Sequence, residues 1–248
     1  MIGLKNKIKM RIFFVLTFIV SINCFSQKHT IKVDYTFNLN IGQYQEFQSI
    51  LYVDKKKSLF LWNNPIVRKV EDENNISINL NELDSIGSFN FRLFSKDSLF
   101  SRIPYFNRKV LLLKEKTPEI NWKIINEVKK IGDYNCQKAI AKFRGRDYIA
   151  WFTSEIPIRS GPWKLHGLPG LILIAYDTSK EIQFVFTSIS KSYYKISPIL
   201  KADQIIGLSE YKKMSKSSSK DFFKKLKSKL PRGAKIKITS KKGIEKFD

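Results

Sequence analysis

The sequence predicts a mainly β protein (α+β): an antiparallel meander that forms a curved sheet, half-barrel or barrel, followed by a C-terminal helix. Two observations support this fold class. About ten short segments alternate apolar and polar residues, which is the period of a β-strand. Asn, Asp, Gly or Pro separates these segments, and no long helical segment lies between neighbouring strands, as a parallel α/β sheet would require.

The first 26 residues are predicted to be a signal peptide. Four basic residues precede the apolar run Ile12–Ile22, which has about half the length of a membrane-spanning helix. We expect cleavage between Ser26 and Gln27, and export to the periplasm, the outer membrane or the extracellular space. A lipoprotein signal acylated at Cys24 is the less favoured alternative, because Asn23 occupies a position where a small residue is expected.

The predicted β domain covers residues 27–210. It begins with Thr30–Asn40, in which every second residue is apolar, as in a strand with one face in water. Phe47–Val53 and Ser58–Trp62 follow, and the charged turn between them predicts an antiparallel pair. The other predicted strands are Ile76–Leu80, Phe89–Phe94, Ser98–Ile103, Arg108–Lys114, Asn121–Val128, Cys136–Arg144, Asp147–Thr153, Leu171–Asp177 and Glu181–Ser190.

Residues 211–248 are predicted to form a lysine-rich helix and tail, and between Tyr211 and Lys246 fourteen basic residues oppose two acidic ones, Asp221 and Glu245. Ser219 is a suitable helix cap, the apolar residues after it follow a helical period, and Pro231 ends the predicted helix. One interpretation is a solvated helix that packs on the sheet. The other is a contact with an anionic membrane, lipopolysaccharide or an acidic partner.

Composition excludes several functional classes. The chain has 248 residues, 43% of them hydrophobic, and a formal charge of +23, which describes a folded and strongly basic protein. Two Cys and two His are too few for a disulfide framework or a zinc cluster, so we expect no metal and no cofactor. A pI near 9.9 suggests nucleic acid, but predicted export argues against a specific nucleic-acid partner.

The most unusual segment is IPIRSGPWKLHGLPGLILI, residues 156–174. It resembles the GLPGLI family of secreted Bacteroidetes proteins of unknown function. The resemblance rests on the hexapeptide Gly167, Leu168, Pro169, Gly170, Leu171 and Ile172, on the preceding Gly161, Pro162 and Trp163, and on upstream segments from Trp122 to Thr153. It implies an exported protein with no established activity and no catalytic residue to carry over.

The motif is also informative on physical grounds. The Pro169–Gly170 step predicts a type II turn with Gly170 at positive φ, and the apolar run that starts at Leu171 predicts a strand buried on both faces. We expect Trp151 and Trp163 to close over this loop. Either the loop only determines shape, or it forms the rim of an apolar pocket.

Catalytic alternatives are weakly supported. A thiol nucleophile would need a histidine as its base. Of the two histidines, His29 lies at the start of the predicted mature chain, so Cys136 with His166 is the combination to consider. Glu155, Asp147 and Asp177 lie near the motif in sequence, so an envelope hydrolase that uses carboxylates is the alternative function. The favoured hypothesis is a non-enzymatic exported binding or accessory protein with no catalytic residue, which holds an apolar ligand or an envelope protein partner.

Overall fold

A computed structural model describes residues 29–41, 43–62, 87–104, 110–198, 200–214 and 244–247. The predicted signal peptide, the predicted strand Ile76–Leu80 and the predicted helix between Ser219 and Leu230 lie outside these ranges. The description that follows concerns the described residues.

Twelve strands follow one another along the described chain. They are β1 (Thr30–Ile41), β2 (Gln43–Val53), β3 (Lys57–Trp62), β4 (Ser88–Leu93), β5 (Ser98–Pro104), β6 (Val110–Lys116), β7 (Lys123–Ile131), β8 (Tyr134–Phe143), β9 (Arg146–Thr153), β10 (Leu171–Asp177), β11 (Ile182–Ser192) and β12 (Gln204–Gly207). Residues 208–214 are helical. The predicted strands within the described ranges are all found, whereas β12 was not predicted.

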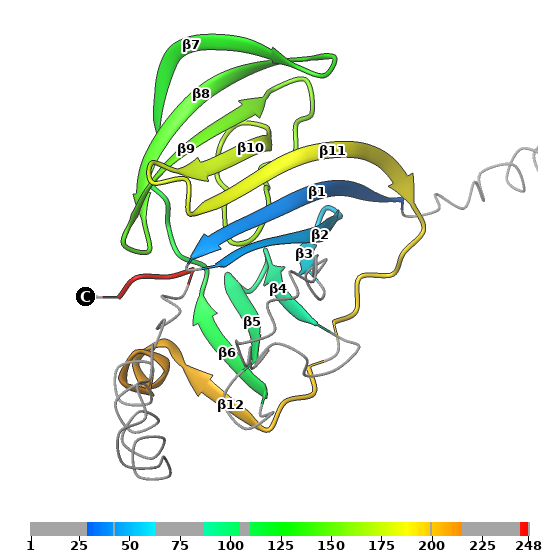
Figure 1. Cartoon of the computed structure of the whole chain (residues 1–248). Helices are drawn as coiled ribbons and strands as arrows, with labels where there is room; N and C mark the ends of the chain where they lie inside the picture. Colours follow the sequence, from blue (N-terminus) through cyan, green and yellow to red (C-terminus); the bar gives the residue numbers. More distant parts are fainter. Residues whose placement is uncertain are drawn as a thin grey trace, which may run out of the picture.

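All twelve strands belong to one curved sheet that does not close into a barrel (Figure 1). Their order is β12-β6-β5-β4-β3-β2-β1-β11-β10-β9-β8-β7. Neighbouring strands are antiparallel, except that β12 pairs with β6 in parallel. The predicted fold class, a curved antiparallel meander with a helix near the C-terminus, is therefore confirmed.

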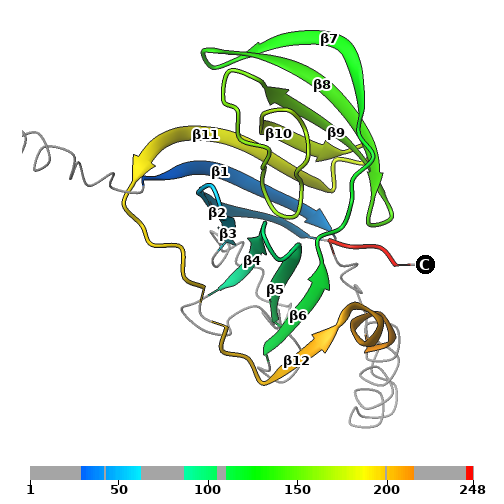
Figure 2. The ribbon, with the colours of Figure 1, turned by 180° about the vertical axis from the view of Figure 1, so that it is seen from behind.

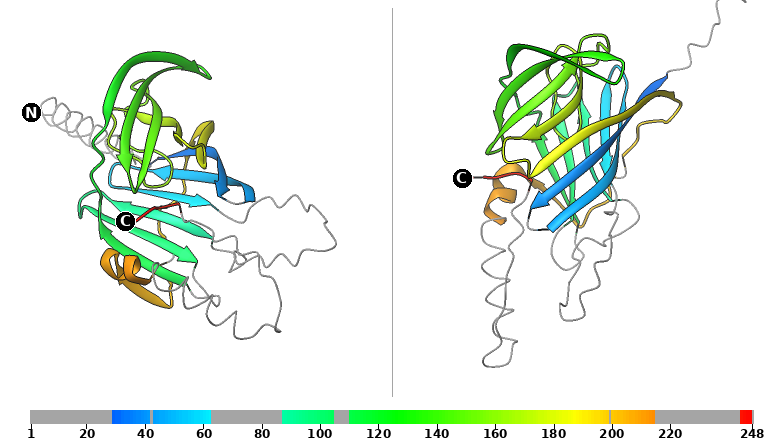
Figure 3. Two further views of the ribbon diagram at one scale, coloured as in Figure 1. Left: turned by 60° about the vertical axis from the view of Figure 1, so that its left-hand side comes forward. Right: turned by 45° about the horizontal axis from the view of Figure 1, so that its top comes forward.

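Strand β1 joins two meanders. The first runs from β1 through β2 to β6, and the second runs from β7 to β11 and returns to β1. Phe37 of β1 lies opposite Phe47 of β2 and Phe184 of β11, and its ring stacks on both at centroid distances of 5.1 and 4.6 Å. Figure 3 shows the two meanders bending toward each other on either side of β1.

The connection between β9 and β10, residues 154–170, is here called the motif loop. Seen from behind, it crosses the space between the two meanders and reaches toward β4 and β5 (Figure 2). Its apolar side chains join the main core together with residues of β1, β8, β10 and β11. No helix among the described residues is long and apolar enough to cross a bilayer.

Candidate functional site

Tight turns fix the path of the motif loop. The Leu165 amide donates to the Pro162 carbonyl at 3.1 Å, with Trp163 at φ +55° inside this turn. A positive φ is costly for a residue with a bulky side chain, so its surroundings must hold Trp163 there. Farther along, the Gly170 amide donates to the Leu168 carbonyl at 2.8 Å across Pro169.

Two motif glycines are required by close packing. A Cβ on Gly170 would overlap the carbonyl oxygen of Thr153, and a Cβ on Gly161 would lie 2.8 Å from the Cβ of Ile172. The prediction of a positive φ at Gly170 is wrong, because among the described motif glycines it is Gly167 that has one, φ +98°. Gly170 is needed for the close approach of the loop to the end of β9, whereas Gly167 is needed for backbone direction.

The two motif tryptophans lie in different surroundings. Trp163 packs against Phe143 and Tyr148 at centroid distances of 5.7 and 6.2 Å. Trp151 is three residues from Tyr148 on β9 and therefore points to the opposite face. There the ammonium group of Lys129 lies 4.1 Å from the centre of its ring. The expectation that Trp151 and Trp163 close over the loop together is therefore wrong.

The apolar motif residues fill the core. Leu171 and Ile172 of β10 are fully buried, as predicted for a strand covered on both faces, and Leu168 is 1% exposed. Gly161, Pro162 and Gly170 are also buried, Gly167 is half-buried and Pro169 is exposed. The apolar side chains of the motif loop therefore pack between the two meanders.

Hydrogen bonds fix the outer part of the motif loop. The Trp122 indole donates to the carbonyl of His166 at 2.8 Å, and Arg159 donates to the carbonyl of Gly167 at 3.1 Å. Burial, together with the nearby guanidinium of Arg92, lowers the pKa of His166 to about 3. The imidazole is therefore neutral, and its buried Nε2 has no hydrogen-bond partner among the described residues.

Four charged side chains are buried together beside Trp163. We call this group the ion cluster: Lys164, Arg144, Glu115 and Glu245. The Lys164 Nζ lies 2.9 Å from Glu115 Oε1 and 2.7 Å from Glu245 Oε1, and the side chain of Lys164 is 2% exposed. Arg144 donates to Glu115 Oε2. Two cations and two carboxylates give the cluster zero formal charge.

A second buried ion group lies on the next strands. Arg146 Nη1 donates to Asp177 Oδ2 at 2.6 Å and to Glu181 Oε2 at 2.5 Å. The hydrogen bond from Arg146 lowers the pKa of Glu181. Asp177 also accepts from the Ser179 hydroxyl and from the Ile182 amide, so both of its oxygens are hydrogen-bonded.

The 244–247 segment connects these two groups. The Lys246 amide donates to the Arg144 carbonyl at 3.0 Å, and Arg146 Nε donates to the Ile244 carbonyl at 2.7 Å. Gly145 lies between them, and a Cβ on it would overlap the Lys246 carbonyl oxygen. Figure 1 shows the segment in red beside the end of β6, the strand that carries Glu115.

The residues predicted for chemistry are not brought into one arrangement. Burial raises the pKa of Cys136 to about 11, and its thiol donates to the Tyr134 carbonyl. Glu155 accepts from the Asn135 amide near the β7–β8 turn, and Asp147 lies on the surface 3.9 Å from Lys142. No three His, Cys, Asp or Glu residues in the described ranges are arranged to hold a metal ion.

Sequence reasoning missed the ion cluster. Lys164 is a single cation between Trp163 and Leu165, and such a charge inside an apolar motif is the one local signal that was present. Its partners are 49 and 81 residues away, so no local pattern connects them.

Comparisons with known proteins give a family segment and a fold. A family model described as "Protein of unknown function (Porph_ging)" matches residues 144–174, which include the motif, Arg144, Arg146 and Lys164. No curated protein matches this chain. The chain therefore resembles a family of unknown function over this segment.

Two solved structures of PNGF-II, in space groups P21 and C2, resemble 75% of the chain with TM-scores of 0.51 and 0.52 at 18% and 17% identity. The chain spans 33% and 32% of their length. An uncharacterized conserved protein from Thermus thermophilus aligns over 73% of this chain and 91% of its own, with a TM-score of 0.41 and 7% identity. At such identities the likeness to PNGF-II shows a similar β fold alone.

Proposed function

We propose that the protein is an exported, non-enzymatic binding protein of the cell envelope, and that it contacts anionic lipid surfaces. Export rests on the predicted signal peptide, residues 1–26. The single observation that carries the membrane contact is a group of tyrosines, two of them exposed, beside exposed lysines, where β1 begins and β11 ends.

We call this group the tyrosine patch: Tyr52, Tyr193 and Tyr194. Tyr193 is 72% exposed and Tyr194 41%, and the rings of Tyr52 and Tyr194 stack at a centroid distance of 4.2 Å. His29 lies edge-on to Tyr193 at 5.0 Å. Tyrosine combines an apolar ring with a polar hydroxyl at its end, and such a side chain suits the headgroup region of a bilayer.

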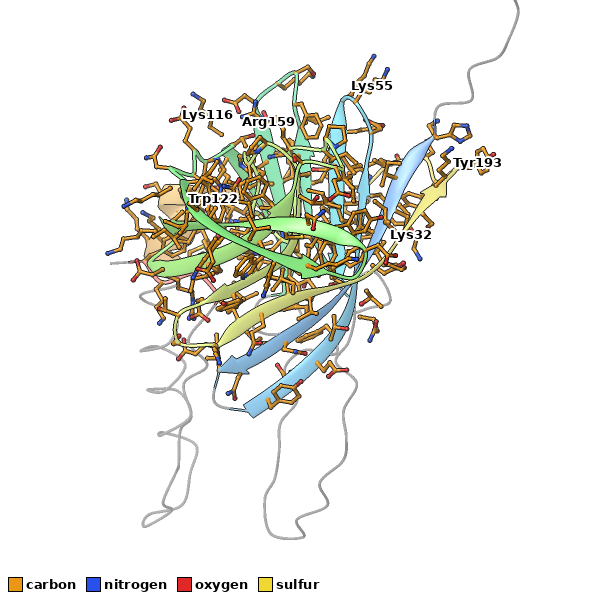
Figure 4. The ribbon with its side chains drawn as sticks, turned by 90° about the horizontal axis from the view of Figure 1, so that it is seen from above. Lys32, Lys55, Lys116, Trp122, Arg159 and Tyr193 are labelled. Atoms are coloured by element: carbon orange, nitrogen blue, oxygen red, sulfur yellow. The ribbon has the colours of Figure 1, made fainter. Side chains whose placement is uncertain are left out.

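Exposed lysines surround the tyrosine patch. Lys57 donates to the Ile196 carbonyl at 2.5 Å and so ties the β2–β3 turn to the segment after β11. The exposed lysines in these two segments and at the end of β11 form no ion pair with another described residue: Lys55, Lys56, Lys191 and Lys195. Figure 4 shows Lys32, Lys55 and Tyr193 on the same side of the molecule. Each lysine near an anionic surface contributes about 1 kcal/mol to binding.

The other predicted ligands are less well supported. The apolar side chains of the motif loop are committed to the core, so recognition is proposed at the surface instead of in an apolar pocket. The lysine-rich residues 211–248 remain a further proposed contact with an anionic membrane or lipopolysaccharide. An envelope protein partner and an apolar ligand stay proposals without a described site, and no observation favours the hydrolase.

Vesicle sedimentation tests the proposal. We expect the mature chain to bind POPC vesicles that contain POPG, and to bind pure POPC vesicles weakly. Changing Tyr193 and Tyr194 to Ser is expected to lower the POPG partition coefficient at least about tenfold. Tyr44→Ser is the matched control, because Tyr44 is 58% exposed at the opposite end of β2.

A third variant separates the patch from the lysine-rich segment. It replaces Lys224, Lys225, Lys227 and Lys229 by Gln and leaves the 244–247 segment intact. If this variant retains POPG binding and the Tyr193/Tyr194 variant loses it, the tyrosine patch is supported as the membrane contact. Equal binding by the Tyr193/Tyr194 variant and the unmodified chain contradicts it.

A further inference from the structure

The ion cluster depends on a carboxylate from a distant part of the chain. Glu115 comes from β6, Arg144 from the β8–β9 turn and Lys164 from the motif loop, whereas Glu245 belongs to the 244–247 segment. Without Glu245, one carboxylate would face two cations whose side chains are at most 9% exposed. These exposures hold with the segment in place, and a buried unpaired charge is strongly unfavourable, so a segment seated here must carry a carboxylate.

The 244–247 segment is held by peptide-like contacts. Its backbone donates to Arg144 and accepts from Arg146, and Glu245 supplies the carboxylate. The ring of Phe247 lies 5.9 Å from Tyr211 and within cation–π distance of Arg144 and Lys212, at 5.6 and 5.0 Å. The Lys246 Nζ also lies 3.3 Å from Glu181 Oε2, so these contacts recognise the order apolar, acidic, basic, aromatic.

The receiving side is built with strained backbone. Arg144 occupies the first position of the two-residue β8–β9 turn at φ +50°, where Asn, Asp or Gly is favoured, and Gly145 follows at φ +71°. Trp163 at φ +55° directs the chain just before Lys164. Both cations of the cluster are thus placed by non-glycine residues in a left-handed conformation, a kind of strain that is concentrated at binding sites.

Two buried polar groups beside the segment have no hydrogen-bond partner among the described residues. They are the Tyr148 hydroxyl and Arg144 Nε, which lies 3.6 Å from Glu245 Oε1. The side chain of Arg144 is 9% exposed, and Tyr148 is 1% exposed. Both atoms are therefore available to a further hydrogen bond from whatever segment is seated here.

We propose that this site binds an extended peptide of a partner protein that presents a carboxylate, and that the chain's own 244–247 segment occupies it in the free protein. The partner peptide supplies a carboxylate to Lys164 and Arg144 and an aromatic side chain to the place of Phe247. Because the internal segment competes at an effective concentration on the order of millimolar, the site is closed to weak ligands. This inference is independent of the tyrosine patch.

Peptide titration of the full chain tests the proposal. The probe is a fluorescein-labelled synthetic hexapeptide with the sequence of residues 242–247, Lys-Gly-Ile-Glu-Lys-Phe. Glu245→Lys in the protein would bring a third cation to Arg144 and Lys164, so we expect it to expel the internal segment. We expect the variant to bind the probe at least about tenfold more tightly than the unmodified chain. Glu119→Lys makes the same charge change at an exposed site and is expected to leave probe binding unchanged.

Two further arms make the result specific. A probe with Gln in place of its Glu is expected to lose at least about tenfold in affinity for the Glu245→Lys variant. Equal affinity of both probes, or equal binding by the variant and the unmodified chain, overturns the proposal. A concentration-dependent dimer of the unmodified chain that is lost in Glu245→Lys would assign the site to a second copy's segment, and also overturns it.

Hydrogen exchange on the unmodified chain covers the case in which the Glu245→Lys variant does not fold. Excess unlabelled hexapeptide is expected to speed exchange of the Lys246 amide several-fold, because the internal segment leaves its bond to Arg144. The amides of β8 and β9 stay protected. An unchanged Lys246 amide at saturating peptide overturns the proposal.

Discussion

Strand β11 joins two regions in which cationic side chains have opposite surroundings. Near Ile182, at one end of the strand, Arg146 is buried and bonded to Asp177 and Glu181. At the other end, beyond Ser192, lysines stand in solvent beside the tyrosine patch. Near the motif loop, the buried cations Arg146 and Lys164 form ion pairs with carboxylates, and these pairs hold the fold together. The exposed lysines beside the tyrosine patch have no ion-pair partner among the described residues and are free to attract an anionic partner.

The largest expected effect is at Lys164. Lys164→Met would leave Glu115 and Glu245 facing each other with Arg144 alone, so we expect a loss of about 3 to 5 kcal/mol in the free energy of unfolding. Guanidinium denaturation measures it. Lys142→Met removes an exposed pair with Asp147 and should cost less than about 1 kcal/mol. Similar losses in the two variants would erase the distinction between buried and exposed cations.

Gly170→Ala tests whether the motif loop is as tightly packed as the ion cluster. A Cβ there meets the backbone of Thr153, which has no rotamer to change, so we expect a loss of about 2 to 3 kcal/mol in the free energy of unfolding. Gly132→Ala is the control: φ is +56° but nothing lies within 4 Å, and the expected loss is about 1 kcal/mol. An equal loss at both positions would show that the loop adapts to the added methyl group.

The pH dependence of stability sharpens the comparison at His166. Its folded pKa of about 3 lies below its usual value, so the unfolded chain binds a proton more readily than the folded chain. Stability is full above about pH 6.5 and falls as the pH decreases, by about 2 kcal/mol between pH 7 and pH 5. Urea denaturation at the two pH values should show this loss in the unmodified chain and a smaller loss in His166→Gln.

The smallest expected stability change is at the tyrosine patch. Changing Tyr193, at 72% exposure, to Ser should alter the free energy of unfolding by less than about 0.5 kcal/mol. Thermal unfolding of the variant checks this expectation. A loss comparable to that of Lys164→Met would mean that the patch is part of the fold, and its exposure would no longer argue for a membrane contact.

Periodicity predicted the strands but not the site. The alternation in Thr30–Asn40 and the apolar run from Leu171 give β1 and β10 directly, because side-chain direction in a strand follows sequence position. Strand β12 was missed because it is four residues long and is held by parallel pairing with β6. The role of Lys164 was missed because burial of a charge depends on partners that only the folded chain assembles.

The central position of β1 has a consequence for how the chain is made. Thr30 pairs with Ser192, so the strand that appears first must wait for one of the last strands before the two meanders join. A chain is delivered from its N-terminus, whether by the ribosome or through a translocation pore. Completion of the sheet is therefore delayed until most of the polypeptide has emerged, and such long sequence separation between paired strands slows folding.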